Sequence, residues 1–158
     1  MPDPHLPKDS DVDLHEPRQR AELRHPAPVL LSIAVGGALG AAARYGLGRA
    51  FPVTANGFPW TTFGINVTGC LLSGILMVLV TDVFPERRLR RPVGGVGVLG
   101  GFTTFSTYAV ETSQLLRDGR VGTAVAYLLG TVATAVPAVW LGLAVTRAAV
   151  RQERGAGG

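Results

Sequence analysis

The polar groups that could do chemistry in this chain stand inside long apolar stretches. The clearest case is the run from Gly94 to Tyr108, GGVGVLGGFTTFSTY, in which paired glycines precede threonine and serine with an aromatic residue every third position. This run is a poor continuous helix, and backbone that breaks in an apolar environment needs protein, water or an ion as partner. A break here would place the carbonyls of Gly100 and Thr103 where they can bind a cation. The alternative is that the glycines only pack and the hydroxyls bond to carbonyls one turn earlier.

Three further polar side chains lie in similar surroundings. Asn66 is a bare amide in the apolar sequence FGINVTG, so it must face a partner helix or a pore, because an unpaired amide in hydrocarbon costs several kcal/mol. Its NH2 group can donate to an anion, or it can join two helices. Arg44 is a candidate functional charge unless it reaches the interface by snorkelling. Glu111 is expected to face an aqueous vestibule.

The elements that carry these residues read as membrane helices. The 158 residues are 47% hydrophobic and only 16% charged, which is too apolar for an ordinary soluble domain. Four stretches, 29–50, 60–80, 93–116 and 121–146, contain only Arg44, Arg49 and Glu111 as charged residues. At about 1.5 Å per residue each is ~30 Å or longer, enough to cross the hydrocarbon core. We therefore expect an all-α membrane protein with four transmembrane helices, the third broken at its centre. A soluble bundle with buried helices is the alternative.

The ends of the chain differ from this apolar part. Residues 1–28 hold six prolines and ten charges, a composition that predicts a disordered cytoplasmic leader, and residues 148–158 are expected to form a disordered tail. A cleavable signal peptide with Ala41–Ala43 as its cleavage site is the competing interpretation, but the leader is long and acidic and the apolar run is extended. The apolar part is expected to be a single four-helix domain, residues 29–147.

Several function classes are disfavoured by composition. The one cysteine, Cys70, excludes a disulfide framework within the chain, and all three histidines are in the leader, so a zinc-type cluster is not expected. The pI near 10 could suggest a nucleic-acid binder, but the basic residues stand at the ends of apolar segments and form no basic face. An enzyme is also not expected, because no nucleophile, base and orienting group occur together.

The distribution of basic residues predicts an orientation. Eleven lie in the leader, in the 87–91 loop with its four arginines, and at residues 147–154 at the C-terminal end, against two on the opposite side, or three with Arg49. Basic residues are retained in the cytoplasm, so both termini should be cytoplasmic in the cell membrane. Sixteen glycines within the four stretches predict close helix packing and oligomerisation.

The sequence GGFTTFST at 100–107 closely resembles the signature of the CrcB/Fluc fluoride channels. The resemblance extends to Gly36, Gly37 and Gly40 with Arg44 and Tyr45, to Asn66 with Gly69, and to Glu111, and it covers about residues 29–147. It implies a channel that lets cytoplasmic fluoride leave down its electrochemical gradient and so lowers fluoride toxicity. It also implies an antiparallel dimer with two pores.

The resemblance assigns roles to individual residues. It implies a structural, non-transported sodium ion at the dimer centre, held by the main-chain carbonyls of Gly100 and Thr103 from each subunit. The fluoride pore would be lined by Asn66, Phe105, Ser106, Thr107 and Tyr108, and by a hydroxyl of the fourth span such as Thr131 or Thr134. Tyr108 departs from the usual phenylalanine, and its hydroxyl would either donate to the anion or obstruct the pore.

Two questions about partners and function stay open at this level. A homodimer of antiparallel subunits requires each copy to insert in both directions, yet the basic bias favours one, so pairing with a homologous, oppositely biased subunit is the hypothesis beside the homodimer. A proton-coupled small-molecule exporter is the alternative function, with Glu111 as its only acidic candidate inside a span. A membrane scaffold without transport would leave Asn66 and the threonine run unexplained.

Overall fold

The computed structural model describes residues 27–53, 57–83 and 92–156, and all regular structure in these residues is helical. The elements are α2 (Ala27–Ala50), α3 (Trp60–Val78), η1 (Leu79–Val83), η2 (Pro92–Leu99), α4 (Gly100–Phe102), α5 (Phe105–Arg117) and α6 (Val121–Ala156). The segments η1 and η2 are π-helical, and η1 continues α3 without interruption. Long apolar segments become helices because a helix satisfies its own backbone hydrogen bonds.

Within the described residues, three helices are long and apolar enough to cross a membrane: 27–50, 60–83 and 121–153. They agree with three of the four stretches predicted from hydropathy. The remaining stretch, 93–116, which is the third along the chain, consists of the shorter elements η2, α4 and α5. Thr103 and Thr104, between α4 and α5, have extended backbone.

The C-terminal end of the chain differs from the prediction. Residues 1–26 of the predicted leader lie outside the described residues. The helix α6 continues through Ala156, so most of the segment predicted as a disordered tail is helical instead. The physical reason is that alanine, arginine, glutamine and glutamate between residues 147 and 154 are strong helix formers, which the charge pattern alone does not reveal.

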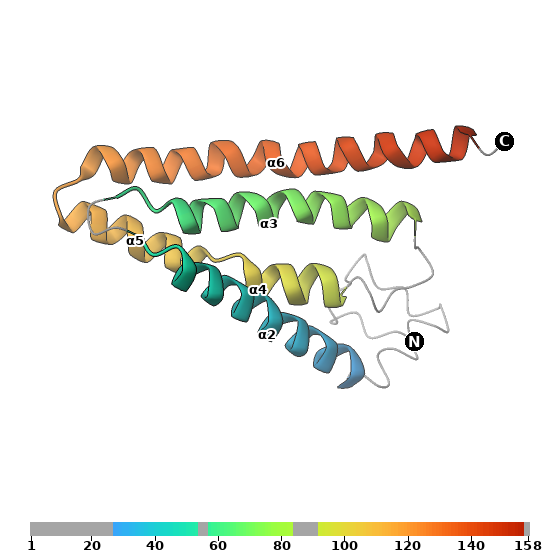
Figure 1. Cartoon of the computed structure of the whole chain (residues 1–158), viewed down its shortest axis with the longest axis horizontal. Helices are drawn as coiled ribbons and strands as arrows, with labels where there is room; N and C mark the ends of the chain where they lie inside the picture. The colour runs from blue at the N-terminus through green and yellow to red at the C-terminus, as the bar shows by residue number, and fades with distance from the viewer. Residues whose placement is uncertain (1–26, 54–56, 84–91, 157–158) are drawn as a thin grey trace, which may run out of the picture.

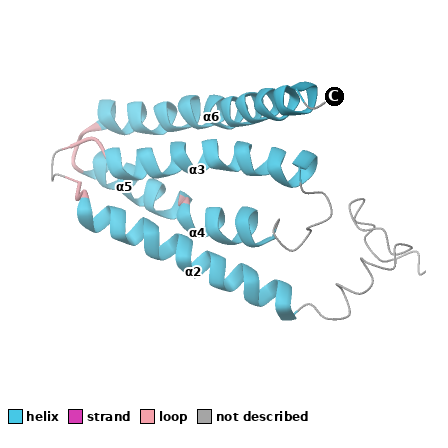
Figure 2. Ribbon diagram, turned by 45° about the vertical axis from the view of Figure 1, so that its right-hand side comes forward, coloured by secondary structure: helices cyan, strands magenta, loops and turns pink. Residues whose placement is uncertain are grey.

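The helices are stacked side by side in the order α6, α3, the α4–α5 segment and α2 (Figure 1). The helix α3 packs along α6, and α2 packs along η2 and α4. The view from another side keeps the same order and shows the short loop that separates α4 from α5 (Figure 2). The interruption therefore lies between α2 and α3.

Glycines allow this close packing around the interruption. A Cβ atom at Gly40 in α2 would overlap the carbonyl oxygen of Val98, and one at Gly101 in α4 would overlap the carbonyl oxygen of Gly37. Lipid offers helices no hydrophobic drive to associate, so such backbone contacts supply the packing that holds α2 against α4. The glycine-rich sequence of the first span thereby fixes the position of residues 97–102.

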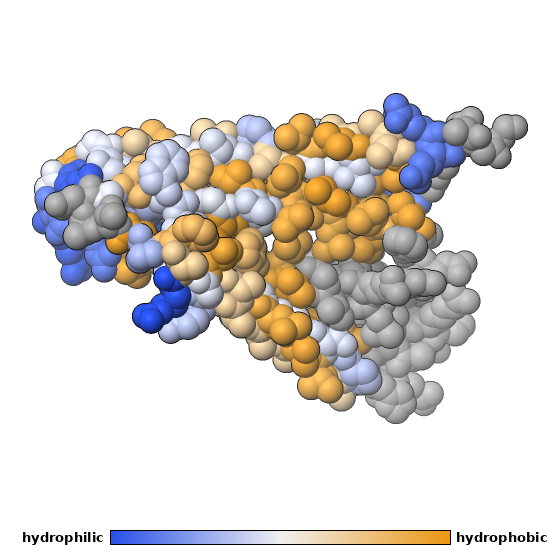
Figure 3. Space-filling model, viewed as in Figure 1, coloured by the Kyte–Doolittle hydropathy of each residue, from blue (hydrophilic) through white to orange (hydrophobic). Residues whose placement is uncertain are grey.

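The buried core is small, and the long sides of the protomer are apolar. Tyr108, Leu115, Ala124 and Tyr127 form a buried cluster, with Phe58 and Phe63 packed against it. Large apolar side chains are exposed along α2, α3 and α6, and hydrophilic residues gather toward the left-hand end and near the C-terminal end of α6 (Figure 3). This arrangement is that of a protein surrounded by lipid or by further apolar helices.

Candidate functional site

The interruption between α4 and α5 is the centre of the candidate site. Thr103 has φ −75° and ψ 156°, and Thr104 has φ −147° and ψ 123°. The side chain of Thr104 accepts a hydrogen bond from the Thr107 amide at 3.2 Å and so caps α5. Threonine is a favoured residue at this position because its oxygen replaces a missing helical acceptor. Local chemistry therefore starts a new helix at Phe105.

Asn66 holds the interrupted backbone from the middle of α3. Its Oδ1 accepts from the Thr104 amide at 2.9 Å, and its Nδ2 donates to the Thr104 carbonyl at 3.0 Å. One amide side chain thus satisfies both main-chain groups of a residue that has left the helix. The structure places Asn66 as a link between helices. One of its amide hydrogens is engaged by the carbonyl of Thr104.

Arg44 reaches the same segment from α2. Its Nε donates to the carbonyl of Gly101 at 3.2 Å, and the residue is half-buried. The position of Arg44 in the first span is explained by this contact, because a helix end inside an apolar bundle needs donors for its last carbonyls. The guanidinium group is thereby placed beside the interruption.

The contacts of Asn66 and Thr104 also determine which carbonyls lose their helical donors. In an uninterrupted helix the amides of Thr104 and Thr107 would bind the carbonyls of Gly100 and Thr103. Here the Thr104 amide binds Asn66 and the Thr107 amide binds the Thr104 hydroxyl. The carbonyls of Gly100 and Thr103 are the two that the sequence predicts as ligands of a cation. Main-chain carbonyl oxygens without these donors are suitable ligands for a hard cation such as sodium.

Phe105 and Tyr108, the predicted pore aromatics, lie at the start of α5 with ring centroids 5.8 Å apart. Phe105 is 79% exposed on the protomer, whereas Tyr108 is 8% exposed and packs edge-on against Tyr127. The hydroxyl of Tyr108 donates to the carbonyl of Leu128 at 2.7 Å. The hydroxyl is therefore engaged by the backbone of α6.

The remaining predicted hydroxyls are distributed over two elements. The Thr104 hydroxyl donates to Thr107 Oγ1 at 3.0 Å and lies 3.3 Å from Ser106 Oγ. In α6, Thr131 donates to the carbonyl of Tyr127 and Thr134 donates to the carbonyl of Gly130, each at 2.7 Å. Thr131 is buried and Thr134 is exposed.

Glu111 has two hydroxyl partners that the sequence analysis missed. Thr62 donates to Oε1 at 2.8 Å, and Tyr127, which is completely buried, donates to Oε2 at 2.7 Å. The three residues come from α3, α5 and α6, and only the packing of these helices brings them together. A usable signal was the phenol itself, because a tyrosine in an apolar span needs a partner for its hydroxyl.

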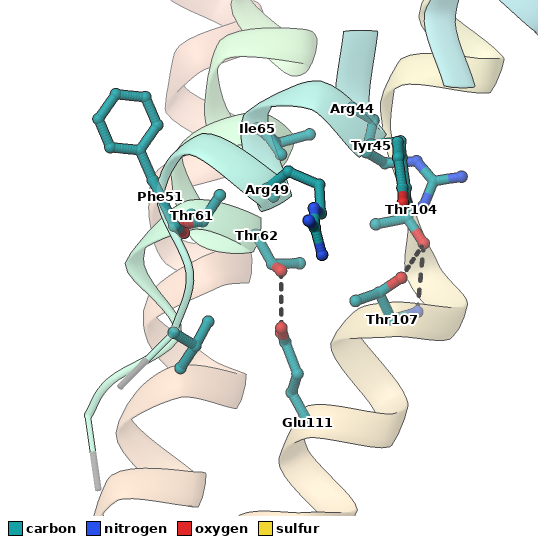
Figure 4. A pocket seen from close by; sticks show the side chains of 12 residues that line it. Arg44, Tyr45, Arg49, Phe51, Thr61, Thr62, Ile65, Thr104, Thr107 and Glu111 are labelled. Atoms are coloured by element: carbon teal, nitrogen blue, oxygen red, sulfur yellow. Dashed lines mark hydrogen bonds between the residues drawn. The ribbon is translucent and has the colours of Figure 1, made fainter. Parts of the chain in front are cut away.

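A cleft leads from the side of the molecule to this network. Its volume is about 320 Å³, and it lies between the C-terminal end of α2, the N-terminal end of α3 and the start of α5. Figure 4 shows Thr62 and Glu111 joined by a hydrogen bond on one wall and Thr104 bonded to Thr107 on another. The residues that line it are Arg44, Tyr45, Gly48, Arg49, Phe51, Val53, Thr61, Thr62, Ile65, Thr104, Thr107 and Glu111.

The polar groups around the interruption are mainly hydrogen-bond donors. In the part of the chain that the structure describes, three or more His, Cys, Asp or Glu side chains do not gather in a metal-binding group. The groups at hand are hydroxyls, an amide, aromatic ring edges and arginines, which donate to or attract anions.

Comparisons with known proteins agree with this chemistry. The family model described as CrcB-like protein, Camphor Resistance (CrcB), matches residues 31–143. The chain is 54% identical over 122 residues to the fluoride-specific ion channel FluC 1 of Streptomyces coelicolor, covering 77% of this chain and 79% of that protein. It is 46% identical over 132 residues to FluC 2 of Streptomyces avermitilis, covering 83% and 84%. It is also 50% identical over 119 residues to FluC 2 of Nocardia farcinica, covering 75% and 85%.

Proposed function

The chain belongs to the CrcB family, and on that premise we propose that it is a fluoride channel of the cell membrane. The observation that carries the proposal is the set of anion donors gathered at one interruption of an apolar helix. Asn66, Thr104 and Thr107 surround that interruption, and Phe105 and Tyr108 follow it directly. The proposed activity is the passage of an ion and not catalysis.

The chemistry of fluoride explains this choice of groups. Fluoride is small and holds its water tightly, so a pore must offer close and strong donors in place of hydration. Hydroxyls, an amide and the positive edges of aromatic rings supply these donors without a fixed charge that would trap the ion. We assign the pore to Asn66, Phe105, Ser106, Thr107 and Tyr108. In α6 the hydroxyl of Thr131 is buried and that of Thr134 is exposed, and each donates to a carbonyl of its own helix.

The direction of transport follows from the proposed passive mechanism. Fluoride that accumulates in the cytoplasm would leave down its electrochemical gradient, which lowers its toxicity. The excess of basic residues in the leader, the 87–91 loop and the tail supports cytoplasmic termini.

A second subunit completes the proposed site. One protomer offers two carbonyls, those of Gly100 and Thr103, whereas a hard cation is normally surrounded by more oxygen ligands. Two antiparallel copies would bring four carbonyls to one sodium ion at the dimer centre. The ion would offset the partial negative charge of the carbonyl oxygens at the two interruptions. The exposed positions of Gly100 and Phe105 on the protomer support burial by a partner.

The sodium proposal has a test that does not depend on transport. The melting temperature of the purified protein in detergent should be higher in sodium than in potassium or N-methylglucamine at equal ionic strength, because an ion that binds only the folded dimer stabilises it. The same melting temperature in all three cations would contradict a sodium site.

The identity of the second subunit follows from the basic bias. We propose that this chain pairs with an oppositely biased homologous subunit in addition to any pairing with itself, since a strongly biased chain inserts mainly in one direction. The test is the topology of the chain expressed alone, read with reporters fused to its C-terminus. Formation of conducting dimers with both orientations by the single chain would overturn the proposed partner.

The experiment for the function is fluoride efflux from liposomes that contain the purified chain, measured with a fluoride electrode. Rapid efflux with fluoride and none with chloride supports the proposal and shows that the chain suffices. Without efflux, the assay is repeated with a co-expressed, oppositely biased homologue. Failure of both preparations would refute the fluoride channel.

A further inference from the structure

The cleft between α2, α3 and α5 is lined by a positively charged side chain, that of Arg49, which is not part of the proposed pore. Arg49 lies in the last turn of α2, is exposed, and lines the cleft. Its guanidinium points into the space between Thr62 and Thr107 (Figure 4). Among the residues that the structure describes, Arg49 has no ion-pair partner within 4.0 Å.

The two other charged side chains of the cleft are held by hydrogen bonds to uncharged groups, which neutralise neither charge. Arg44 donates through Nε to the Gly101 carbonyl, and the carboxylate of Glu111 accepts from the hydroxyls of Thr62 and Tyr127. Hydroxyl partners hold the carboxylate in place but do not neutralise its charge. An anion that enters the cleft toward Thr107 therefore passes a negative group, and a positive charge at the mouth offsets its repulsion.

We propose that Arg49 raises the concentration of fluoride in the cleft beside Thr107 and so increases the conductance of the channel. The inference rests on the proposed function and adds to it a charge outside the pore. A positive charge at the mouth of a cleft raises the local concentration of anions, and the effect falls steeply with ionic strength. Salt dependence is therefore the signature of this role.

The alternative role of Arg49 is a structural one, in which its charge stabilises the C-terminal end of α2. The chain contains a matched control for this alternative. Arg117 is a basic residue in the last turn of α5, and α2 and α5 end toward the same side of the bundle (Figure 1). Arg117 is exposed and does not line the cleft. Removing either charge changes the net charge and the helix end equally, but only Arg49 acts on the cleft.

The test is the single-channel fluoride current in planar bilayers, because this current does not depend on how many proteins insert. Sodium is kept constant, and potassium isethionate sets the ionic strength to about 10 mM or about 1 M, where charges act over ~30 Å and ~3 Å respectively. We expect Arg49→Gln to lower the current about three- to five-fold at low ionic strength and not at high ionic strength. Arg49→Lys and Arg117→Gln should conduct as the wild type does.

Each other result overturns the inference. An equal loss in Arg49→Gln and Arg117→Gln would show a general effect of net charge, and a loss that persists at high ionic strength would show a structural role. An unchanged current in Arg49→Gln would remove the residue from conduction. Absence of fluoride current in the wild type is a different outcome, because it refutes the fluoride channel itself.

Discussion

Substitution of Asn66 by alanine tests the account of the interrupted helix most directly. The change removes two hydrogen bonds and leaves the amide and the carbonyl of Thr104 without partners in an apolar setting. A buried polar group without a partner costs about 1–3 kcal/mol, so two of them destabilise the protein by about 2–6 kcal/mol. For a chain of this size 1 kcal/mol lowers the melting temperature by about 2–4 °C, which gives about 8–16 °C at the middle of that range.

The assay is thermal unfolding of the purified protein in detergent, followed by fluoride efflux from liposomes. Ser73→Ala is the matched control on α3, because the Ser73 hydroxyl bonds only to the carbonyl of Gly69 one turn earlier in its own helix. Its melting temperature should change by less than about 2 °C. Fluoride efflux should be impaired in Asn66→Ala and unchanged in Ser73→Ala. A melting temperature of Asn66→Ala within 2 °C of the wild type, whatever its efflux, would refute the assignment of Asn66 as the support of Thr104.

Three further substitutions test the neighbouring parts of the site. Phe105→Ile should abolish fluoride efflux, because the ring edge is lost while the apolar volume is roughly kept, and an efflux rate equal to the wild type would remove Phe105 from the pore. Tyr127→Phe removes the donor to Glu111 Oε2 and should lower the stability by about 2 kcal/mol, which is a fall of roughly 4–8 °C in melting temperature. The control is Tyr45→Phe, which removes an exposed phenol hydroxyl and should leave the melting temperature unchanged. Gly40→Ala places a methyl group against the Val98 carbonyl and should destabilise the protein by about 1–3 kcal/mol. Gly46→Ala, which has open space around it, should not change the stability. Equal melting temperatures of the two variants would contradict the packing of α2 on α4.

The membrane helices were predictable because hydropathy is a property of each segment alone. The stretches 29–50 and 60–80 agree with α2 and with α3 and η1 to within three residues at each end. The helix α6 is ten residues longer than predicted, because helix propensity and not hydropathy governs its last turns. Hydropathy therefore predicts the length of a helix that ends where its apolar stretch ends. It fails where good helix formers extend the helix beyond that stretch, as in α6.

The candidate site was predictable in its residue types but not in its hydrogen bonds. Asn66 was identified because a polar group in an apolar stretch must have a partner. Glu111 was identified as an acidic residue inside a span and was expected to face an aqueous vestibule. The partners themselves, Thr104 for Asn66 and Thr62 with Tyr127 for Glu111, lie 16–49 residues away along the chain and are set by helix packing. The two interpretations of Asn66, a ligand or a link between helices, were equal in the sequence, and the structure shows the link to Thr104.

The interruption would allow one short segment to bind ions of opposite charge, as we propose. Where α4 ends, the diverted amides of Thr104 and Thr107 leave the carbonyls of Gly100 and Thr103 without their helical donors, and we propose that these oxygens meet a cation. Where α5 begins, its first amides carry the positive end of the helix dipole toward the hydroxyls and rings that we assign to fluoride. A continuous helix through residues 93–117 would pair all of these groups internally and offer neither. The extended backbone of Thr103 and Thr104 is therefore the feature on which both proposals depend, and Asn66 supports it.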